Sequence, residues 1–230
     1  MGESPLVASD GLAERALEGV TQGMKIGFGA GRTPARAIDL LGVRATAGLD
    51  VAVVAASESA EARCRAAGLT VLDFATVEEL DLLVDGVDEI DRDMRALKGS
   101  GGAMARERII AWASRRTIYM AGANKVSDRI GTLAALSIAV LPFGLASTRA
   151  AIRRVGLNGV VRLDMNGGFF VTDNGNLILD VSLPGDEDFE ELAGDLSAIP
   201  GVLDHGLFLH EADRVLIEQA SGEVEELERA

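Results

Sequence analysis

Short apolar runs alternate with amphipathic stretches along the first half of the chain. Each run has the length of a buried β-strand. The runs lie at residues 24–28, 51–55, 70–72, 80–84 and 117–120. Strands that alternate with helices predict right-handed crossovers and a parallel sheet covered on both faces, which is an α/β fold.

Helices are expected between these strands. After the first run, Ala37, Ile38 and Leu41 lie at helical spacing. Thr33 followed by Pro34 precedes them, and this pair is typical of a helix start. A second helix is predicted from a cap at Ser57 or Ser59 through Ala67, and a third at residues 103–114.

The pattern changes after about residue 125. Two strand candidates, residues 169–172 and 177–181, flank Asp173-Asn174-Gly175-Asn176, and an Asn-Gly pair between strands is a strong hairpin signal. A helix is expected at about 187–197, then strands at 207–209 and 215–218. Because strands and helices no longer alternate, we predict a second, smaller α+β domain, with the last strands returning to the first sheet. The acidic tail, residues 223–230, is expected to be frayed.

One uncharged segment, residues 130–148, is close to the length of a membrane span. Pro142 and Gly144 interrupt it, and Thr132 and Ser137 make it more polar. We therefore interpret it as a buried helix followed by a strand, available for the core or for an interface.

Charge and cysteine content narrow the function. With 36 acidic and 22 basic residues the net charge is −14, which argues against binding nucleic acid or an anionic membrane. A small phosphorylated ligand needs only a local cationic pocket and stays possible. A single cysteine, Cys64, fits a reducing cytoplasm, and two histidines with it do not suggest a zinc site. Residues 1–10 lack the pattern of a secretory signal.

Lysine is rare in this chain, because nineteen of the 22 basic residues are arginine. The lysines are Lys25, Lys98 and Lys125. A compact ammonium can stabilise a point charge or donate a proton where guanidinium does so poorly. Each lysine is therefore a candidate for chemistry, although compositional bias explains Lys25 equally well.

Three segments follow predicted strands, where parallel α/β sheets bind ligands. The first is the glycine-rich loop at residues 27–33, whose glycines permit close backbone approach and whose following helix attracts anions. It is a poor dinucleotide fingerprint, because Arg32 replaces the last glycine and no acid ends the next strand. A tight turn without a ligand is the alternative.

The second segment is Asp85 to Asp91, in which Asp85 and Asp88 can point into one cleft. An acidic surface turn is the alternative for this segment.

In the third segment, Lys98 and a glycine run precede a helix that carries Glu107 among apolar neighbours. A carboxylate in such surroundings suits general-base work. An ion pair with Arg106 or Arg108 is the alternative. Lys125 ends another predicted strand and is a candidate phosphate ligand.

The remaining side chains of chemical interest are expected to be structural. His205 and His210 lack a serine or cysteine partner signature, and Cys64 is expected to pack within a helix. Trp112 and the phenylalanines are expected in the core.

Taken together, these motifs resemble ribose-5-phosphate isomerase, type A. The family's G-T-G-S-T loop, D-G-A-D-E motif, K-G-G-G-A…R-E block, lysine loop, T-D-N-G-N hairpin and I-P-G-V…H-G segment all have counterparts in the same order. They are Gly29-Ala30-Gly31-Arg32-Thr33, Asp85 to Glu89, Lys98 to Glu107, Asn124-Lys125, Thr172 to Asn176, and Ile199 to Gly206. Each motif alone is common, whereas six in this order are specific.

The resemblance implies a Rossmann-like domain, residues 1–126 plus about 204–230, and a ferredoxin-like domain, residues 127–203. It implies interconversion of ribose 5-phosphate and ribulose 5-phosphate through an enediolate, without metal or cofactor, in a homodimer or homotetramer.

The resemblance also assigns roles to residues. Glu107 would move the proton, Asp85 would assist ring opening, Asp88 would hold sugar hydroxyls and Lys98 would stabilise the oxyanion. The glycine loop, Gly29 to Thr33, and Lys125 would bind the substrate.

Two departures from the family bear on the substrate. Ala30 and Arg32 replace a threonine and a serine of the glycine loop, and Ala139 replaces an acid in the family's P-V-E-V strand. Arg32 can supply a bidentate phosphate contact, or the loop fits a different aldose phosphate. A non-catalytic sugar-phosphate sensor is a further alternative, although such a sensor has little need for a proton-transfer base.

Overall fold

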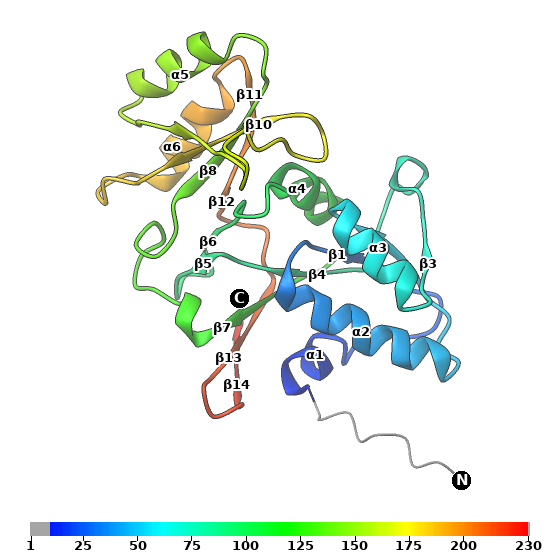
Figure 1. Ribbon diagram of the computed structural model, residues 1–230. Coiled ribbons are helices and arrows are strands. Elements are labelled where there is room, and N and C mark those ends of the chain that lie inside the picture. The colour runs from blue at the N-terminus through cyan, green and yellow to red at the C-terminus, as the bar shows by residue number, and fades with distance from the viewer. Residues whose placement is uncertain (1–9, 230) are drawn as a thin grey trace.

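The protein is described by a computed structural model covering residues 10–229, in which a seven-stranded sheet is the largest element (Figure 1). The strand order is β14-β13-β7-β4-β1-β2-β3. Their bounds are β1 (Lys25–Phe28), β2 (Ala52–Ala55), β3 (Thr70–Val71), β4 (Leu82–Gly86), β7 (Thr117–Gly122), β13 (Arg214–Glu218) and β14 (Val224–Glu228). All pairings are parallel except that of β14 with β13, which confirms the α/β fold class.

Alternate residues of these strands face opposite layers of helices. One layer consists of α1 (Gly11–Ala16), α2 (Arg32–Thr46) and α3 (Glu58–Ala66), and α4 (Met104–Ala113) covers the other face. On β2, for example, Val53 packs with the first layer whereas Val54 packs with Ile110 of α4. Burial of both strand faces explains why these strands read as continuous apolar runs.

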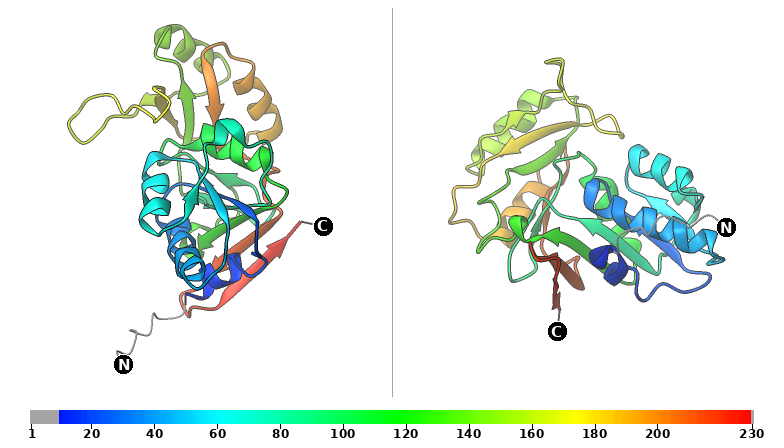
Figure 2. Two further views of the ribbon diagram at one scale, coloured as in Figure 1. Left: turned by 90° about the vertical axis from the view of Figure 1, so that its right-hand side faces the viewer. Right: turned by 60° about the horizontal axis from the view of Figure 1, so that its bottom comes forward.

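A smaller antiparallel sheet projects from one end of the large sheet, as both views in Figure 2 show. Its order is β11-β8-β10-β9, and α5 and α6 both pack against one face of it. The bounds are β8 (Leu136–Val140), α5 (Leu145–Arg154), β9 (Val160–Val161), β10 (Leu177–Val181), α6 (Phe189–Ser197) and β11 (Val202–His205). A three-stranded sheet of β5 (Glu89–Ile90), β6 (Ala96–Leu97) and β12 (Leu207–Phe208) lies between the two parts. Two short 3-10 helices complete the fold, η1 (Phe74–Thr76) and η2 (Ala123–Lys125).

The order of the large sheet contains a topological switch point. The chain leaves β1 towards β2 on one side and leaves β4 towards β7 on the other, although β1 and β4 are neighbours. Diverging connections open a crevice at the carboxyl ends of such strands. Residue 29 follows β1 and Asp85 lies near the end of β4, so two of the candidate segments meet there.

Three predictions about secondary structure are wrong. Helix α2 begins at Arg32, with Gly31 and not Thr33 as its N-cap, because Gly31 adopts a φ of 107° that favours glycine. Residues 130–148 form a loop, then strand β8, then the start of α5, so the predicted helix-then-strand order is reversed. Residues 169–172 make only isolated bridges, although the Asn-Gly turn itself forms, with Gly175 at a φ of 78°.

Residues 224–228 of the acidic tail are also not frayed, because they form β14, paired with β13 along its whole length. Charge pairing explains this outcome: Glu226 bonds to both Arg15 and Arg214, and Glu225 bonds to Arg92. Trp112 is a further correction, since it lies on the outer face of α4 with 91% of its surface exposed. Phe143 and Phe169 are exposed as well, unlike the buried Phe28, Phe189 and Phe208.

Within residues 10–229, no helix has the length and apolar character needed to cross a membrane. The prediction about a secretory signal concerns residues 1–10, and residues 1–9 lie outside the described part of the chain.

Candidate active site

A cavity of about 540 Å³ opens at the switch point. It is lined by the loop after β1, the end of β4, the loop before α4, and η2. Of the residues singled out from the sequence, eight line it: Ala30, Gly31, Arg32, Thr33, Asp88, Lys98, Glu107 and Lys125. The other two, Gly29 and Asp85, are not part of its lining.

Lys98 is the centre of the charged cluster. Its side chain is 3% exposed, and its Nζ lies 2.9 Å from Asp85 Oδ2 and 3.3 Å from Glu107 Oε2. The same ammonium donates a hydrogen bond to the carbonyl of Gly86. Burial alone would lower the pKa of Lys98, but the two carboxylates outweigh burial and raise it. Lys98 is therefore held as a cation at neutral pH.

Asp85 is completely buried behind this lysine. Burial, aided by the charge of Glu107, raises the pKa of Asp85 to about 7 despite the opposing effect of Lys98. Gly29 makes room for the carboxyl, because a Cβ at residue 29 would lie 1.5 Å from Asp85 Oδ1. The glycine after β1 is thus required for Asp85 to occupy its position.

Glu107 reaches the cavity from the first turn of α4. Its Oε1 accepts a hydrogen bond of 3.2 Å from the backbone N–H of Ala30, and the side chain is buried. The alternative pairings with neighbouring arginines do not occur. Arg106 bonds to residues of the 172–176 hairpin, and Arg108 bonds to Asp204 and Glu211. The carboxylate is therefore shared between Lys98 and the glycine loop.

Asp88 is oriented by the loop before α4. Ser100 donates to it from its backbone N–H over 2.8 Å and also from its hydroxyl. Both carboxylate oxygens are thus held from one side, and Asp88 lines the cavity that Lys98 and Glu107 also line.

Two further cations and a helix N-terminus lie on the cavity wall. Arg32 and Lys125 both line it, as do Gly31 and Thr33 at the start of α2. Burial lowers the pKa of Lys125, with Lys98 and Arg32 contributing in the same direction and Asp88 opposing them. The N-terminus of a helix attracts anions, so this part of the wall suits a phosphate group.

The sequence as a whole matches known proteins. A family model described as ribose 5-phosphate isomerase A (phosphoriboisomerase A) matches residues 52–222. This chain belongs to the ribose 5-phosphate isomerase A family.

Relatives support the same family along nearly the full chain. The ribose-5-phosphate isomerase A of Rhodopseudomonas palustris is 43% identical over 224 residues, covering 95% of this chain and 96% of the relative. A solved D-ribose-5-phosphate isomerase in complex with phospho-erythronic acid has a TM-score of 0.90 and 30% identity, covering 95% of this chain and 96% of that one. The Plasmodium falciparum enzyme has a TM-score of 0.90 and 28% identity, covering 96% and 99%. The resemblance drawn from the motifs is confirmed.

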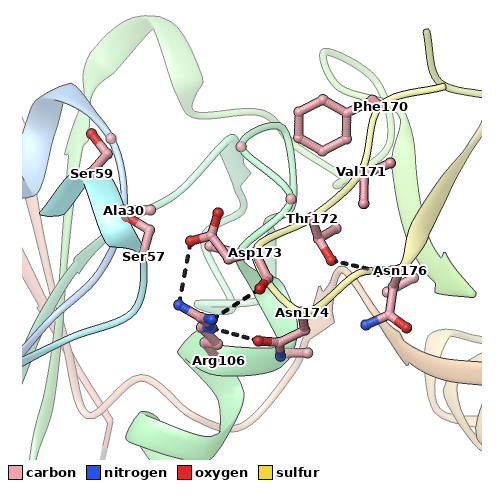
Figure 3. A pocket seen from close by; sticks show the side chains of 16 residues that line it. Ala30, Ser57, Ser59, Arg106, Phe170, Val171, Thr172, Asp173, Asn174 and Asn176 are labelled. Carbon is pink, nitrogen blue, oxygen red and sulfur yellow. Dashed lines mark hydrogen bonds and ion pairs between the residues drawn. The ribbon is translucent and has the colours of Figure 1, made fainter. Parts of the chain in front are cut away.

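The T-D-N-G-N hairpin of the family borders a second hollow, of about 330 Å³, next to the first. Figure 3 shows Ser57, Ser59 and Ala30 on one side of it and the hairpin on the other. Arg106 bridges α4 and the hairpin, because its Nε donates to Asn174 Oδ1 over 2.7 Å and its Nη2 to the carbonyl of Asp173. The backbone N–H of Glu58 also bonds to Asp173. The hairpin is therefore tied to the large sheet's helices.

Several residues of the site were not found from the sequence. The rings of Tyr119 and Phe208 lie 5.4 and 5.5 Å from Lys98 Nζ, and Ser100 holds Asp88. Apolar runs and a serine in a glycine loop carry no chemical signal of their own. Only the folded chain brings the two rings next to the ammonium and Ser100 next to Asp88.

His205 and Cys64 are buried away from the cavity, whereas His210 lies at the surface with its Nε2 2.7 Å from Glu190 Oε1. Burial and the charge of Arg108 lower the pKa of His205 to about 4, and the ring of His205 contacts Ser197 and the backbone of Leu207. Cys64 is buried in the core of α1–α3, where burial raises its pKa to about 11. Within residues 10–229, no group of His, Cys, Asp and Glu side chains is arranged to hold a metal ion.

Proposed function

We propose that this chain interconverts ribose 5-phosphate and ribulose 5-phosphate through an enediolate, with Glu107 as the base. The observation that carries the proposal is the buried Glu107 carboxylate on the cavity wall, 3.3 Å from the Lys98 ammonium. A carboxylate base beside a cation fits proton removal next to a carbonyl, where negative charge grows on oxygen. Family membership and the names of the relatives support this reaction.

In the proposed step, Glu107 takes the proton from C2 of the open-chain aldose. The electron pair of that C–H bond forms the C1–C2 double bond, and the carbonyl oxygen O1 takes the negative charge. The O2 hydroxyl proton then moves to O1. Glu107 returns its proton to C1, which leaves a carbonyl at C2 and completes the ketose.

Lys98 fits the role of oxyanion stabiliser because the proton transfer moves one negative charge from Glu107 to the substrate without changing the total charge of the site. Before the step the negative charge is on Glu107, and after it the charge is on the substrate oxygen. The Lys98 ammonium, already bonded to Glu107 and to Asp85, needs only to shift its interaction to that oxygen. Such preorganisation avoids a large rearrangement during the reaction.

Asp88, Arg32 and Lys125 are proposed to bind the two ends of the sugar phosphate. Asp88 accepts hydrogen bonds and therefore suits the sugar hydroxyls. The phosphate would be bound by the loop from Gly29 to Thr33, which contains Arg32 and the start of α2, and by Lys125. Asp85 is buried behind Lys98, so the ring opening expected of it requires proton transfer through the Lys98 ammonium. A solved relative in complex with phospho-erythronic acid supports a phosphorylated sugar acid or sugar in this cavity.

The test is turnover of ribose 5-phosphate by the purified protein, in ordinary and in deuterated water. An enediolate exchanges its carbon-bound proton with solvent, so deuterium is expected in both sugars. Hexose phosphates run in parallel test whether Arg32 changes the substrate preference. Binding of ribose 5-phosphate without turnover of any sugar phosphate would instead identify a sensor and overturn the proposal.

We also propose a cytoplasmic homodimer or homotetramer. Edge strand β9 and the loop after it expose apolar side chains, which water disfavours and a second copy would cover. These are Val160, Leu163, Met165, Phe169 and Val171, each more than half exposed. Sedimentation of the purified protein, compared with a Val160→Arg variant, tests the assembly.

The division into residues 1–126 with 204–230 and residues 127–203 stays a prediction, supported by the separate large and small sheets.

A further inference from the structure

The loop at residues 98–102 connects the reacting groups of the proposed site. Its first residue is Lys98, and its third, Ser100, holds Asp88 through both its backbone N–H and its hydroxyl. Gly99 and Gly102 adopt φ values of 119° and 74°, a conformation that side chains rarely allow. A loop of this kind needs support from outside itself to keep one conformation.

Arg162, which follows β9 in the small sheet, supplies such support. Its Nη1 donates to the carbonyl of Gly99 over 2.9 Å and to the carbonyl of Ser100 over 2.8 Å. Its side chain is 15% exposed, and neither hollow described above is lined by it. Arg162 therefore contacts the loop from behind and not from the substrate side.

The other guanidinium donors of Arg162 fix it to the small sheet. Nε donates to Asp180 Oδ2 over 2.8 Å, and Nη2 donates to Asp180 Oδ1 and, over 2.7 Å, to the hydroxyl of Ser137. Asp180 on β10 and Ser137 on β8 are directly paired residues. All five N–H groups of the guanidinium are thus used, a fork that the single ammonium of a lysine cannot reproduce.

Phe170 adds a second contact between the same two parts of the molecule. Its backbone N–H bonds to the carbonyl of Arg162, and its ring lies 5.4 Å from the guanidinium. A Cβ at Gly102 would lie 2.6 Å from this ring, so the far end of the loop is in close contact with the small sheet as well.

We propose that Arg162 is a positioning residue for the isomerase reaction, which holds Lys98 and Asp88 in reacting geometry through the backbone of residues 99 and 100. The inference rests on the proposed function. Lys98 directly precedes Gly99 in the chain, and Asp88 is hydrogen-bonded to Ser100. Arg162 binds the carbonyls of these same two residues, Gly99 and Ser100. Misplacing a reacting group by about 1 Å can cost up to about 100-fold in rate.

The test compares Arg162→Lys and Arg162→Met with the wild type, using ribose 5-phosphate turnover and thermal unfolding. Both variants are expected to lose about 10- to 100-fold in kcat, because Lys98 is displaced. KM is expected to rise by a smaller factor, because the hydroxyl contacts of Asp88 are disturbed while Arg32 and Lys125 are untouched. Lysine keeps the charge but not the five-donor fork, so it is expected not to rescue the rate. Arg149→Lys is the matched control, since Arg149 donates to a carbonyl within the small-sheet region, that of Gly159, and is expected to retain wild-type kcat.

Two outcomes would overturn the inference. Wild-type kcat in the folded Arg162→Lys protein would show that the fork does not set the geometry. A loss of turnover equal to the loss of folded protein, in both variants, would show that Arg162 acts on stability alone. If the wild type itself fails to turn over ribose 5-phosphate, the proposed function fails, which is a result distinct from either of these.

Discussion

Glu107 and Lys98 form an ion pair of 3.3 Å although their side chains are only 6% and 3% exposed. A buried charge without a partner costs several kcal/mol, and the pairing of these two groups offsets that cost. The pair connects the first turn of α4 to the loop that precedes it.

Removing the basicity of Glu107 tests the central role. Glu107→Gln keeps the size of the side chain but cannot accept a proton, and we expect kcat to fall by about 10²- to 10⁴-fold. Steady-state kinetics on ribose 5-phosphate measures this loss. Glu191→Gln, at an exposed position on α6, is the control that should behave as wild type. Normal turnover by Glu107→Gln would exclude it as the base.

Lys98 can be replaced by an uncharged side chain of similar length. Lys98→Met is expected to lower kcat by about 10²- to 10³-fold, as removal of an oxyanion donor does elsewhere. It also leaves two buried carboxylates, Asp85 and Glu107, without their cation. Kinetics and circular dichroism together separate rate from folding. The exposed Lys25→Met is the matched control, and equal kcat in the two variants would contradict the role of Lys98.

Asp85 predicts a pH dependence of stability. Its folded-state pKa is about 7 against an ordinary value of 3.8, so between these values the folded protein binds a proton that the unfolded chain has released. The contribution of Asp85 to stability is therefore complete below pH 3.8, falls as pH rises, and is lost above about 7.

Asp85→Asn lacks this titration. We expect the variant to gain free energy of unfolding, relative to wild type, as pH rises from about 4 to about 7. Urea unfolding of both proteins across this range measures the difference. Carboxylates away from residue 85 titrate in both proteins and cancel. A difference that stays constant with pH would show that the burial of Asp85 does not set its proton affinity.

Arg32 is predicted to act on the phosphate. Arg32→Ala should raise KM for ribose 5-phosphate by about 10-fold or more, with little change in kcat, because a charge-assisted contact is lost in ground state and transition state alike. Turnover of ribose without its phosphate should not respond. Arg154→Ala, exposed on α5, is the control. Equal KM in Arg32→Ala and wild type would remove Arg32 from the phosphate site.

Gly29 is predicted to be required by the position of Asp85. Gly29→Ala places a Cβ 1.5 Å from Asp85 Oδ1, so the carboxyl must move, at a cost of about 1–3 kcal/mol in free energy of unfolding. Gly19→Ala is the control, since nothing lies within 4 Å of its added Cβ. In an Asp85→Ala background the cost should largely disappear. A cost unchanged in that background would place the clash elsewhere.

The sequence by itself determined the α/β class and the order of the chemical motifs. Apolar runs such as residues 51–55 and the Asn-Gly turn at Gly175 depend on local periodicity and local backbone preference, which a sequence displays directly. The family motifs identified Glu107, Lys98 and Asp85 as candidates, because residue types and their order along the chain are also displayed directly by a sequence.

Only the tertiary structure decided which charges meet. Arg106 and Arg108 flank Glu107 in the sequence, yet they pair with residues about 67 to 103 positions away, and Lys98 takes the carboxylate instead. The acidic tail likewise becomes β14 because arginines from distant elements neutralise it. Pairing of charges depends on distances between elements, and those are set by how the sheets and helices pack, not by spacing along the chain.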